Sequence, residues 1–169
     1  REETFSSYKI AFETLANETK TLYLHLNRTK HLKVPLTLID QHGKTLKVAA
    51  DKMEFLIQRR AVLALDYLRS LTDPEAIADG ALSLLRIAQE RNRQGIDDKD
   101  LQFFKNFGFV DGEAVEIDIG ELTVDSPPKP LKQELETLSL QLQEFIAEET
   151  PAALPLFKRK RDLLFRSLP

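Results

Sequence analysis

The chain has 169 residues, of which 42% are hydrophobic and 30% charged, and its formal net charge is −3. This length fills one core and is short for two, so we expect a single unit over residues 1–169. The acidic balance argues against nucleic acid or an anionic membrane as partner. No apolar run approaches the roughly 20 residues that cross a bilayer, the N-terminal residues lack a signal-peptide pattern, and cysteine is absent. These features favour a reducing compartment, and we expect a cytoplasmic protein.

The first 60 residues combine one helical pattern with several strand patterns. Phe5, Tyr8, Phe12 and Leu15 recur at helical spacing and predict a helix within residues 4–20. Alternating leucines predict a strand over 22–26. Residues 36–40 and 45–48 read as a hairpin that turns through Gln41 to Lys44, and residues 55–57 read as a short strand.

After residue 60 the hydrophobic period becomes helical. Val62, Leu65 and Leu68 form a short stripe, and Asp73 followed by proline predicts the start of a longer helix that Gly95 ends. The clearest stripe lies within residues 131–146 and predicts a helix buried along Leu135, Leu138, Leu142 and Phe145. Prolines at 151 and 155 break this pattern, and a basic helix is expected over 156–168. The fold class that follows is α+β, mostly helical after residue 60, with small antiparallel hairpins.

The stretch from Gly95 to Glu121 carries most of the functional signal. Asp97, Asp98 and Asp100 precede Asn106, and two apolar runs then flank Asp111-Gly112, a strong hairpin signal. The second run ends in Ile117-Asp118-Ile119-Gly120. Side chains with oxygen donors, suited to a hard cation such as Mg²⁺, therefore lie on both sides of one hairpin.

The alternation of side chains predicts the register of this hairpin. A two-residue turn would place Phe107 opposite Glu116 and mix apolar with polar groups on each face. A three-residue loop from Val110 to Gly112 instead places Phe107 opposite Val115 and Asn106 opposite Glu116, and we expect this register. Asn106 and Asp118 are then diagonal neighbours, roughly 7–8 Å apart at Cβ, and can share one cation.

This arrangement resembles the catalytic-loop asparagine, hairpin and D-F-G segment of protein-kinase-like phosphotransferases, including the aminoglycoside-kinase branch. The resemblance implies that Asn106 and Asp118 hold the Mg²⁺ of bound ATP, with Ile119 at the position of the phenylalanine. It also implies that residues 1–60 are the remnant of a nucleotide-binding lobe, with Phe55 to Arg60 as the hinge, and that residues 61–169 form the helical lobe.

The resemblance leaves two candidates for the catalytic base. The family places an aspartate five residues before the asparagine and shortly after a histidine. In this chain Asp100 lies six and Asp98 eight residues before Asn106, and neither follows closely after a histidine. We therefore name Asp98 and Asp100 as candidates to orient an acceptor hydroxyl. The structural alternative is that the aspartates of residues 97–100 cap a short helix, with Asn106 a turn former and Asp118 a strand end.

Three functional hypotheses follow. The first is a kinase-like domain that is non-catalytic or incomplete in this chain and binds nucleotide and Mg²⁺ weakly, since no glycine-rich phosphate loop and no V-A-I-K-like lysine precede the first helix. The second is an active ATP-dependent phosphotransferase that depends on upstream residues for nucleotide clamping. The third is an unrelated α+β interaction module whose helix 131–146 docks on a protein partner.

Overall fold

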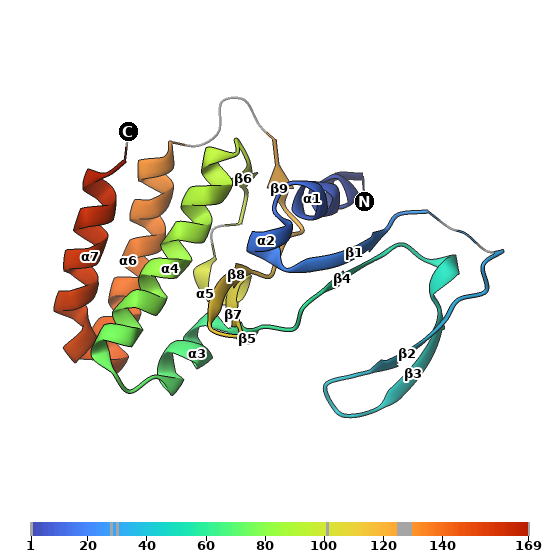
Figure 1. The fold of residues 1–169 in the computed structure, drawn as a ribbon, viewed down its shortest axis with the longest axis horizontal. Helices are drawn as coiled ribbons and strands as arrows, with labels where there is room; N and C mark the ends of the chain where they lie inside the picture. The colour runs from blue at the N-terminus through green and yellow to red at the C-terminus, as the bar shows by residue number, and fades with distance from the viewer. Residues whose placement is uncertain (1, 28, 30, 101, 125–129, 169) are drawn as a thin grey trace.

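The computed structural model describes residues 2–27, 29, 31–100, 102–124 and 130–168. The fold is α+β, with 53% helix, 21% strand and small antiparallel sheets of two or three strands, as the sequence predicts (Figure 1). Within the described residues, no helix has both the length and the apolar character that a membrane span requires.

The N-terminal part contains a helical segment and two separate two-stranded sheets. The expected helix over 4–20 is divided into two pieces that are separated at residues 14 and 15, and Lys20, in the left-handed conformation at φ 51°, ends the second piece. The expected strands and the 36–48 hairpin are confirmed, and Asp40 Oδ1 accepts hydrogen bonds from the amides of His42 and Lys44 at 2.8 and 2.9 Å within the turn. The elements are α1 (Glu2–Glu13), α2 (Ala16–Thr19), β1 (Thr21–His25), β2 (Pro35–Ile39), β3 (Thr45–Ala49), η1 (Ala50–Lys52) and β4 (Phe55–Gln58), with β1 paired to β4 and β2 to β3.

The C-terminal part is dominated by long helices. Asp73 caps α4 by accepting hydrogen bonds from the amides of Glu75 and Ala76, and Gly95 follows the helix at φ 74°. The stripe that starts at Val62 is helical only from Ala64, since Val62 and Leu63 form a strand. Pro155 lies in the first turn of the last helix and does not interrupt it. The helical elements are α3 (Ala64–Ser70), α4 (Pro74–Arg93), α5 (Phe103–Asn106), α6 (Leu131–Glu149), η2 (Pro151–Ala153) and α7 (Leu154–Arg166).

The main core lies where α4, α6 and α7 pack side by side (Figure 1). The predicted stripe of α6 is confirmed: Leu135, Leu138 and Leu142 are fully buried, and Phe145 is 6% exposed. Phe157 of α7 and the leucines of α4 complete this cluster. We call these three helices the helical wall; of them, α4 packs against the central hairpin.

The register of the central hairpin differs from our expectation. The strands are β7 (Phe107–Val110) and β8 (Glu113–Glu116), and Phe107 pairs with Glu116 across a two-residue turn at Asp111-Gly112, where φ is 51° and 82°. The predicted three-residue loop is wrong because it assumed one buried and one open face. All of β7 is buried, and the polar Glu116 is itself buried against a charged partner.

Two further pairings complete the frame around the hairpin. Strand β5 (Val62–Leu63) joins the open edge of β7, which gives a three-stranded order β5-β7-β8. Strand β6 (Asp97–Asp98) pairs antiparallel with β9 (Leu122–Thr123). This second pairing brings the acidic loop that follows β6 beside the segment that follows the hairpin, although more than 20 residues of sequence separate the paired strands.

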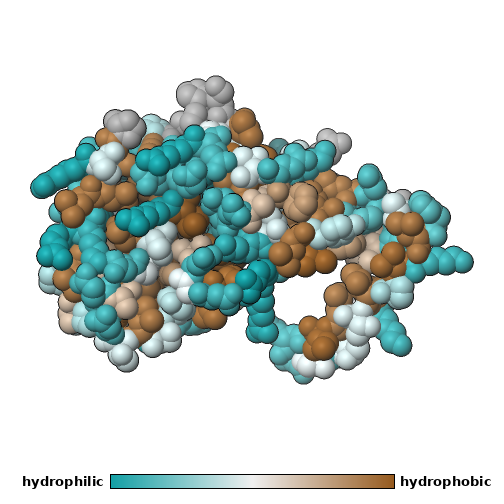
Figure 2. All heavy atoms as spheres, viewed as in Figure 1, coloured by the Kyte–Doolittle hydropathy of each residue, from teal (hydrophilic) through white to brown (hydrophobic). Residues whose placement is uncertain are grey.

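The β2–β3 ribbon projects from the rest of the molecule. It touches η1, and none of its described residues belongs to the main core. Several of its aliphatic side chains are exposed, among them Leu38, Leu46 and Ile39, the last at 72%. Figure 2 shows apolar surface on both sides of the gap between this ribbon and the body of the protein.

Candidate functional site

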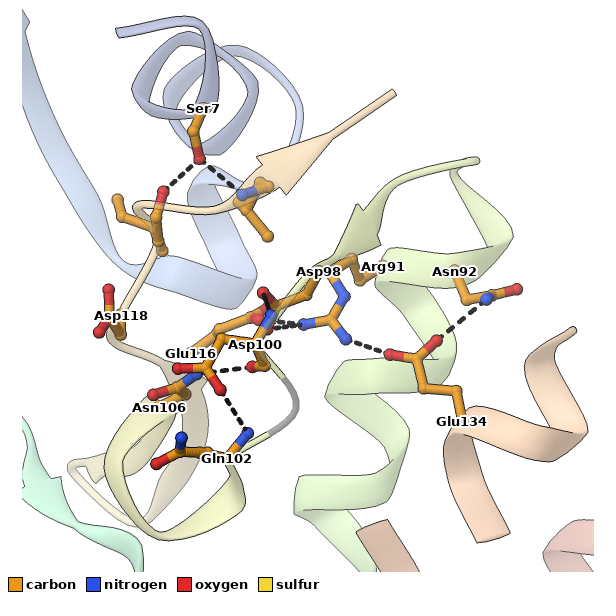
Figure 3. A network of polar contacts seen from close by, with 12 residues as sticks. Ser7, Arg91, Asn92, Asp98, Asp100, Gln102, Asn106, Glu116, Asp118 and Glu134 are labelled. Carbon is orange, nitrogen blue, oxygen red and sulfur yellow. Dashed lines mark hydrogen bonds and ion pairs between the residues drawn. The ribbon is translucent and has the colours of Figure 1, made fainter. Parts of the chain in front are cut away.

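The loop that joins β6 to the hairpin is shaped by its own side chains. Asp98 Oδ1 accepts a hydrogen bond from the Asp100 amide at 2.9 Å, and Asp100 Oδ1 accepts one from the Gln102 amide at 3.1 Å. Asn106 Nδ2 donates to the Asp100 carbonyl at 2.7 Å (Figure 3). These short-range bonds are typical of Asp and Asn in turns, and they fix the position of Asp100 relative to Asn106.

The bond to Asp100 also orients the Asn106 amide. Asn106 is only 1% exposed, and its Oδ1 has no hydrogen-bond partner among the described residues. A buried acceptor without a partner costs free energy, and such an atom requires an explanation such as a bound ion or water. The nitrogen of the Asn106 amide is thus held, while its buried oxygen has no partner among the described residues.

Asp118 follows the hairpin on the other side. The amide of Ile117 donates to the Asn106 carbonyl at 2.7 Å, which extends the strand pairing by one residue and places Asn106 beside Ile117. In the register that we expected, Asn106 faced Glu116 and Asp118 was its diagonal neighbour; that diagonal placement is wrong, because the observed register is shifted by one residue. The Asp118 side chain is exposed and accepts a long bond of 3.4 Å from the Gly120 amide. In Figure 3, Asn106 and Asp118 both lie on the side of the site away from Glu134.

Helix α1 holds the segment that follows Asp118. The buried Ser7 Oγ accepts a hydrogen bond from the Leu122 amide at 2.8 Å and donates to the Ile119 carbonyl (Figure 3). Ile119 and Leu122 also pack in a second apolar cluster with Ala11 and Leu15. The position of Asp118 is thus coupled to the N-terminal helix.

A charged cluster lies buried behind the site, centred on Arg91 of α4. Arg91 is fully buried; its Nη1 lies 3.4 Å from Asp98 Oδ2 and contacts Glu116 Oε1, and its Nη2 contacts Glu134 Oε1 of α6. Asn92 Nδ2 donates to the other oxygen of Glu134 at 3.0 Å. One guanidinium therefore joins α4, β6, β8 and α6 (Figure 3).

Burial dominates the electrostatics of this cluster. Burial removes water from the Glu116 carboxyl group and raises its pKa to about 8. The attraction to Arg91 acts in the opposite direction but is the smaller effect. Burial likewise raises the pKa of Asp98 to about 6, against the same attraction to Arg91. Desolvation tends to lower the pKa of Arg91, but the net direction is upward because Glu116, Glu134 and Asp98 favour its charge. Burial thus favours the protonated form of Glu116, whereas its carboxylic neighbours favour the charged form of Arg91.

The structure separates the two aspartates that we named as catalytic candidates. Asp98 is 1% exposed and faces Arg91, so its carboxylate is directed into the protein. Asp100 is half-buried and is attached to Asn106 through its carbonyl. Asp100 is therefore the better placed of the two to meet an acceptor hydroxyl.

No group of three or more His, Asp or Glu side chains in the described ranges is arranged to hold a metal ion. A cation at Asn106 and Asp118 would have to take its remaining ligands from water or from a substrate. This requirement fits Mg²⁺, which keeps several waters and is usually bound through one or two carboxylates together with substrate phosphates.

Sequence reasoning missed Arg91, Glu134 and Ser7. Arg91 lies in the last turn of α4, where basic residues are common because they interact favourably with the helix dipole. A signal was present, because Arg91 lies three residues after Ala88 on the apolar stripe of α4, and Glu134 lies four before Leu138 on that of α6. Opposite charges at core positions of two helices indicate a buried ion pair.

Comparisons with protein-family models, with curated proteins and with solved structures gave no match to this chain. The function of this chain must therefore be inferred from its own residues and their geometry.

Proposed function

We propose that this chain is a kinase-like domain that binds a nucleoside triphosphate through Mg²⁺ held by Asn106 and Asp118. The observation that carries the proposal is the Asn106 amide, whose nitrogen is bonded to Asp100 and whose buried oxygen has no partner among the described residues. A cation is a chemically suitable partner for that oxygen, and Asp118, which follows the Ile117 paired with Asn106, can supply a negative charge.

The order of elements supports the same proposal. Helix α4, strand β6, the acidic loop, the hairpin and the Asp118-Ile119-Gly120 segment follow one another as the resemblance implies. Gln58, in the expected hinge, donates to the Glu116 carbonyl at 2.8 Å and to the Thr19 carbonyl at 2.6 Å. The N-terminal strands are therefore attached directly to the hairpin that carries the site.

Binding without phosphoryl transfer is the version that the residues of this chain favour. The six glycines are scattered singly, and no glycine-rich loop is present to cover phosphates. Two protein ligands for Mg²⁺ without further phosphate contacts give weak binding, which the nucleotide phosphates must complete.

A second candidate function is phosphoryl transfer, which the bond between Asn106 and the Asp100 carbonyl favours. Asp100 would accept the proton of an acceptor hydroxyl while that oxygen bonds to the γ-phosphorus and the bond from γ-phosphorus to the bridging oxygen breaks. ADP is then the leaving group. The third candidate, an α+β interaction module, is favoured by the exposed aliphatic side chains of the β2–β3 ribbon.

Thermal unfolding with and without ligand tests the proposal. ATP with Mg²⁺ at 100 times its Kd should add about 2.7 kcal/mol to the free energy of unfolding. We expect Asp118→Asn to abolish this gain, and Glu121→Gln, which removes an exposed charge three residues away, to retain it. Absence of any gain in the unmutated chain would contradict nucleotide binding. Release of ADP in the presence of an acceptor would distinguish the phosphotransferase from the binding domain.

A further inference from the structure

We infer that Arg91 is a positioning residue that sets the spacing between the two halves of the Mg²⁺-nucleotide site. This inference rests on the proposed function. The two halves are the loop that contains Asp100 and Asn106, and the segment that contains Asp118. Arg91 contacts Asp98, which precedes the first half, and Glu116, which precedes the second, rather than the proposed metal ligands themselves.

A single nitrogen atom connects the halves. Arg91 Nη1 faces Asp98 Oδ2 at 3.4 Å and also contacts Glu116 Oε1. The other oxygen of Asp98 accepts the amide of Asp100, so the first half is fixed through this carboxylate. Glu116 ends β8 two residues before Asp118, so the second half is fixed through the strand. Without the guanidinium, two buried carboxylic groups would face each other with no positive partner.

The guanidinium has its own support from outside the site. Arg91 Nη2 contacts Glu134, and Glu134 is held in turn by Asn92 at 3.0 Å. Both Arg91 and Asn92 belong to α4, whereas Glu134 belongs to α6. The guanidinium is therefore held in place by contacts between these two helices. The planar guanidinium can satisfy these directions together, which a single ammonium cannot.

Stability alone does not explain this arrangement. A buried ion cluster pays a large desolvation cost and is often no more stabilising than apolar residues of the same volume. Here, two of the three carboxylic partners of Arg91 lie two residues from Asp100 and Asp118. The cluster therefore connects the helical wall to both halves of the site.

The test is Arg91→Lys, which keeps the positive charge and loses the fork. Outer residues that orient metal ligands typically contribute 10–100-fold to metal affinity, so we expect the Kd for ATP with Mg²⁺ to rise about 10-fold or more. The Kd for ATP without Mg²⁺ should stay unchanged. The matched control is Arg69→Lys, since Arg69 also contacts two carboxylates, Asp66 and Glu149, but is exposed and joins α3 to α6 instead.

Hydrogen exchange in the ligand-free protein gives a second readout that needs no nucleotide. Under conditions where global unfolding is negligible, Arg91→Lys should accelerate exchange at the amides of Asp100 and Gly120 and leave the amides of α7 unchanged. If Arg91→Lys does not fold, Glu134→Gln, which keeps the side-chain shape, should cause the same changes to a smaller extent.

The outcomes separate this inference from the proposed function. An unchanged Kd for ATP with Mg²⁺ in a folded variant, or faster exchange spread evenly over the chain, would overturn the positioning role while nucleotide binding stands. If the unmutated protein does not bind ATP with Mg²⁺, the proposed function fails. In that case the hydrogen-exchange pattern alone tests whether Arg91 positions the two segments. Faster exchange confined to these segments supports this positioning role, and any other pattern rejects it.

Discussion

At the scale of single residues, the buried acids make stability depend on pH. Glu116 has its pKa raised from 4.5 to about 8, so between these values the folded protein holds a proton that the unfolded chain has released. The free energy of unfolding should therefore be highest near the lower value, fall as the pH rises and level off above about 8. Asp98, raised from 3.8 to about 6, adds to the fall at the acidic end of this range. Chemical denaturation at a series of pH values measures the slope.

The control for this prediction is Glu116→Gln, which has nearly the shape of the protonated side chain. Its free energy of unfolding should be almost independent of pH between about 6 and 8, because the group that loses a proton is gone. A variant with the same slope as the unmutated chain would show that Glu116 is not the titrating group.

The sequence makes local patterns visible and gives little sign of the buried charges. Asn106, Asp118 and Asp100 are candidates because short spacings around a hairpin are visible in one stretch of sequence. Arg91 meets Glu116 and Glu134, which lie 25 and 43 residues further along the chain. No local spacing encodes such contacts, and only the charge on an apolar helix stripe indicates them.

At the scale of elements, the hairpin shows how a packing assumption misleads. The alternation rule predicts register when one face is open to solvent, but β7 is buried on both faces and β5 covers its edge. A Cβ on Gly108 would lie 2.5 Å from the Val62 carbonyl oxygen, so this glycine lets the two strands approach.

Two glycine substitutions compare these effects. Gly112→Ala should lower the free energy of unfolding by about 1–2 kcal/mol, because its φ of 82° is strained for alanine while the added methyl group makes only an ordinary contact with Tyr67 Oη at 3.5 Å. Gly108→Ala should cost more, since its methyl group collides with the backbone of β5. Equal losses, measured by denaturant titration, would contradict the close approach of β5 and β7.

Helix α6 provides a test of the main core. Leu138→Ala removes a fully buried side chain and should cost about 2–5 kcal/mol. Leu140→Ala, on the same helix but 55% exposed, is the matched control and should change stability by less than about 0.5 kcal/mol. Similar melting temperatures for the two variants would mean that the buried stripe of α6 is misassigned.

At the scale of the whole molecule, helices and hairpins were predictable while their assembly was not. The helical periodicity of apolar residues, the Asp73 cap and the turn residues predict α4, α6 and the 36–48 hairpin, because each of these signals is local in sequence. The β6–β9 and β5–β7 pairings each join only two residue pairs, which carry no periodic signal, and they form because the surrounding packing holds them. These short pairings bring the two halves of the site together.

The projecting ribbon yields a prediction at this scale. Pro35 and Ala49 are direct partners at its base, so a short Gly-Ser segment can replace the strands between them. Because none of the ribbon's described residues belongs to the main core, the melting temperature should shift by no more than about 2 °C. A much larger fall would show that the ribbon contributes to the folding of the body.

The central claim is that Asn106 and Asp118 bind one cation together with a nucleotide. The most direct measurement is the paramagnetic broadening of backbone amide signals in NMR spectra when Mn²⁺ replaces Mg²⁺. With ATP present, we predict strong broadening at the amides near Asn106 and Asp118 and none in α7, and with Mn²⁺ alone we predict much weaker broadening, because the phosphates supply the missing ligands. Broadening centred elsewhere, or none with ATP and Mn²⁺ together, would contradict the shared site.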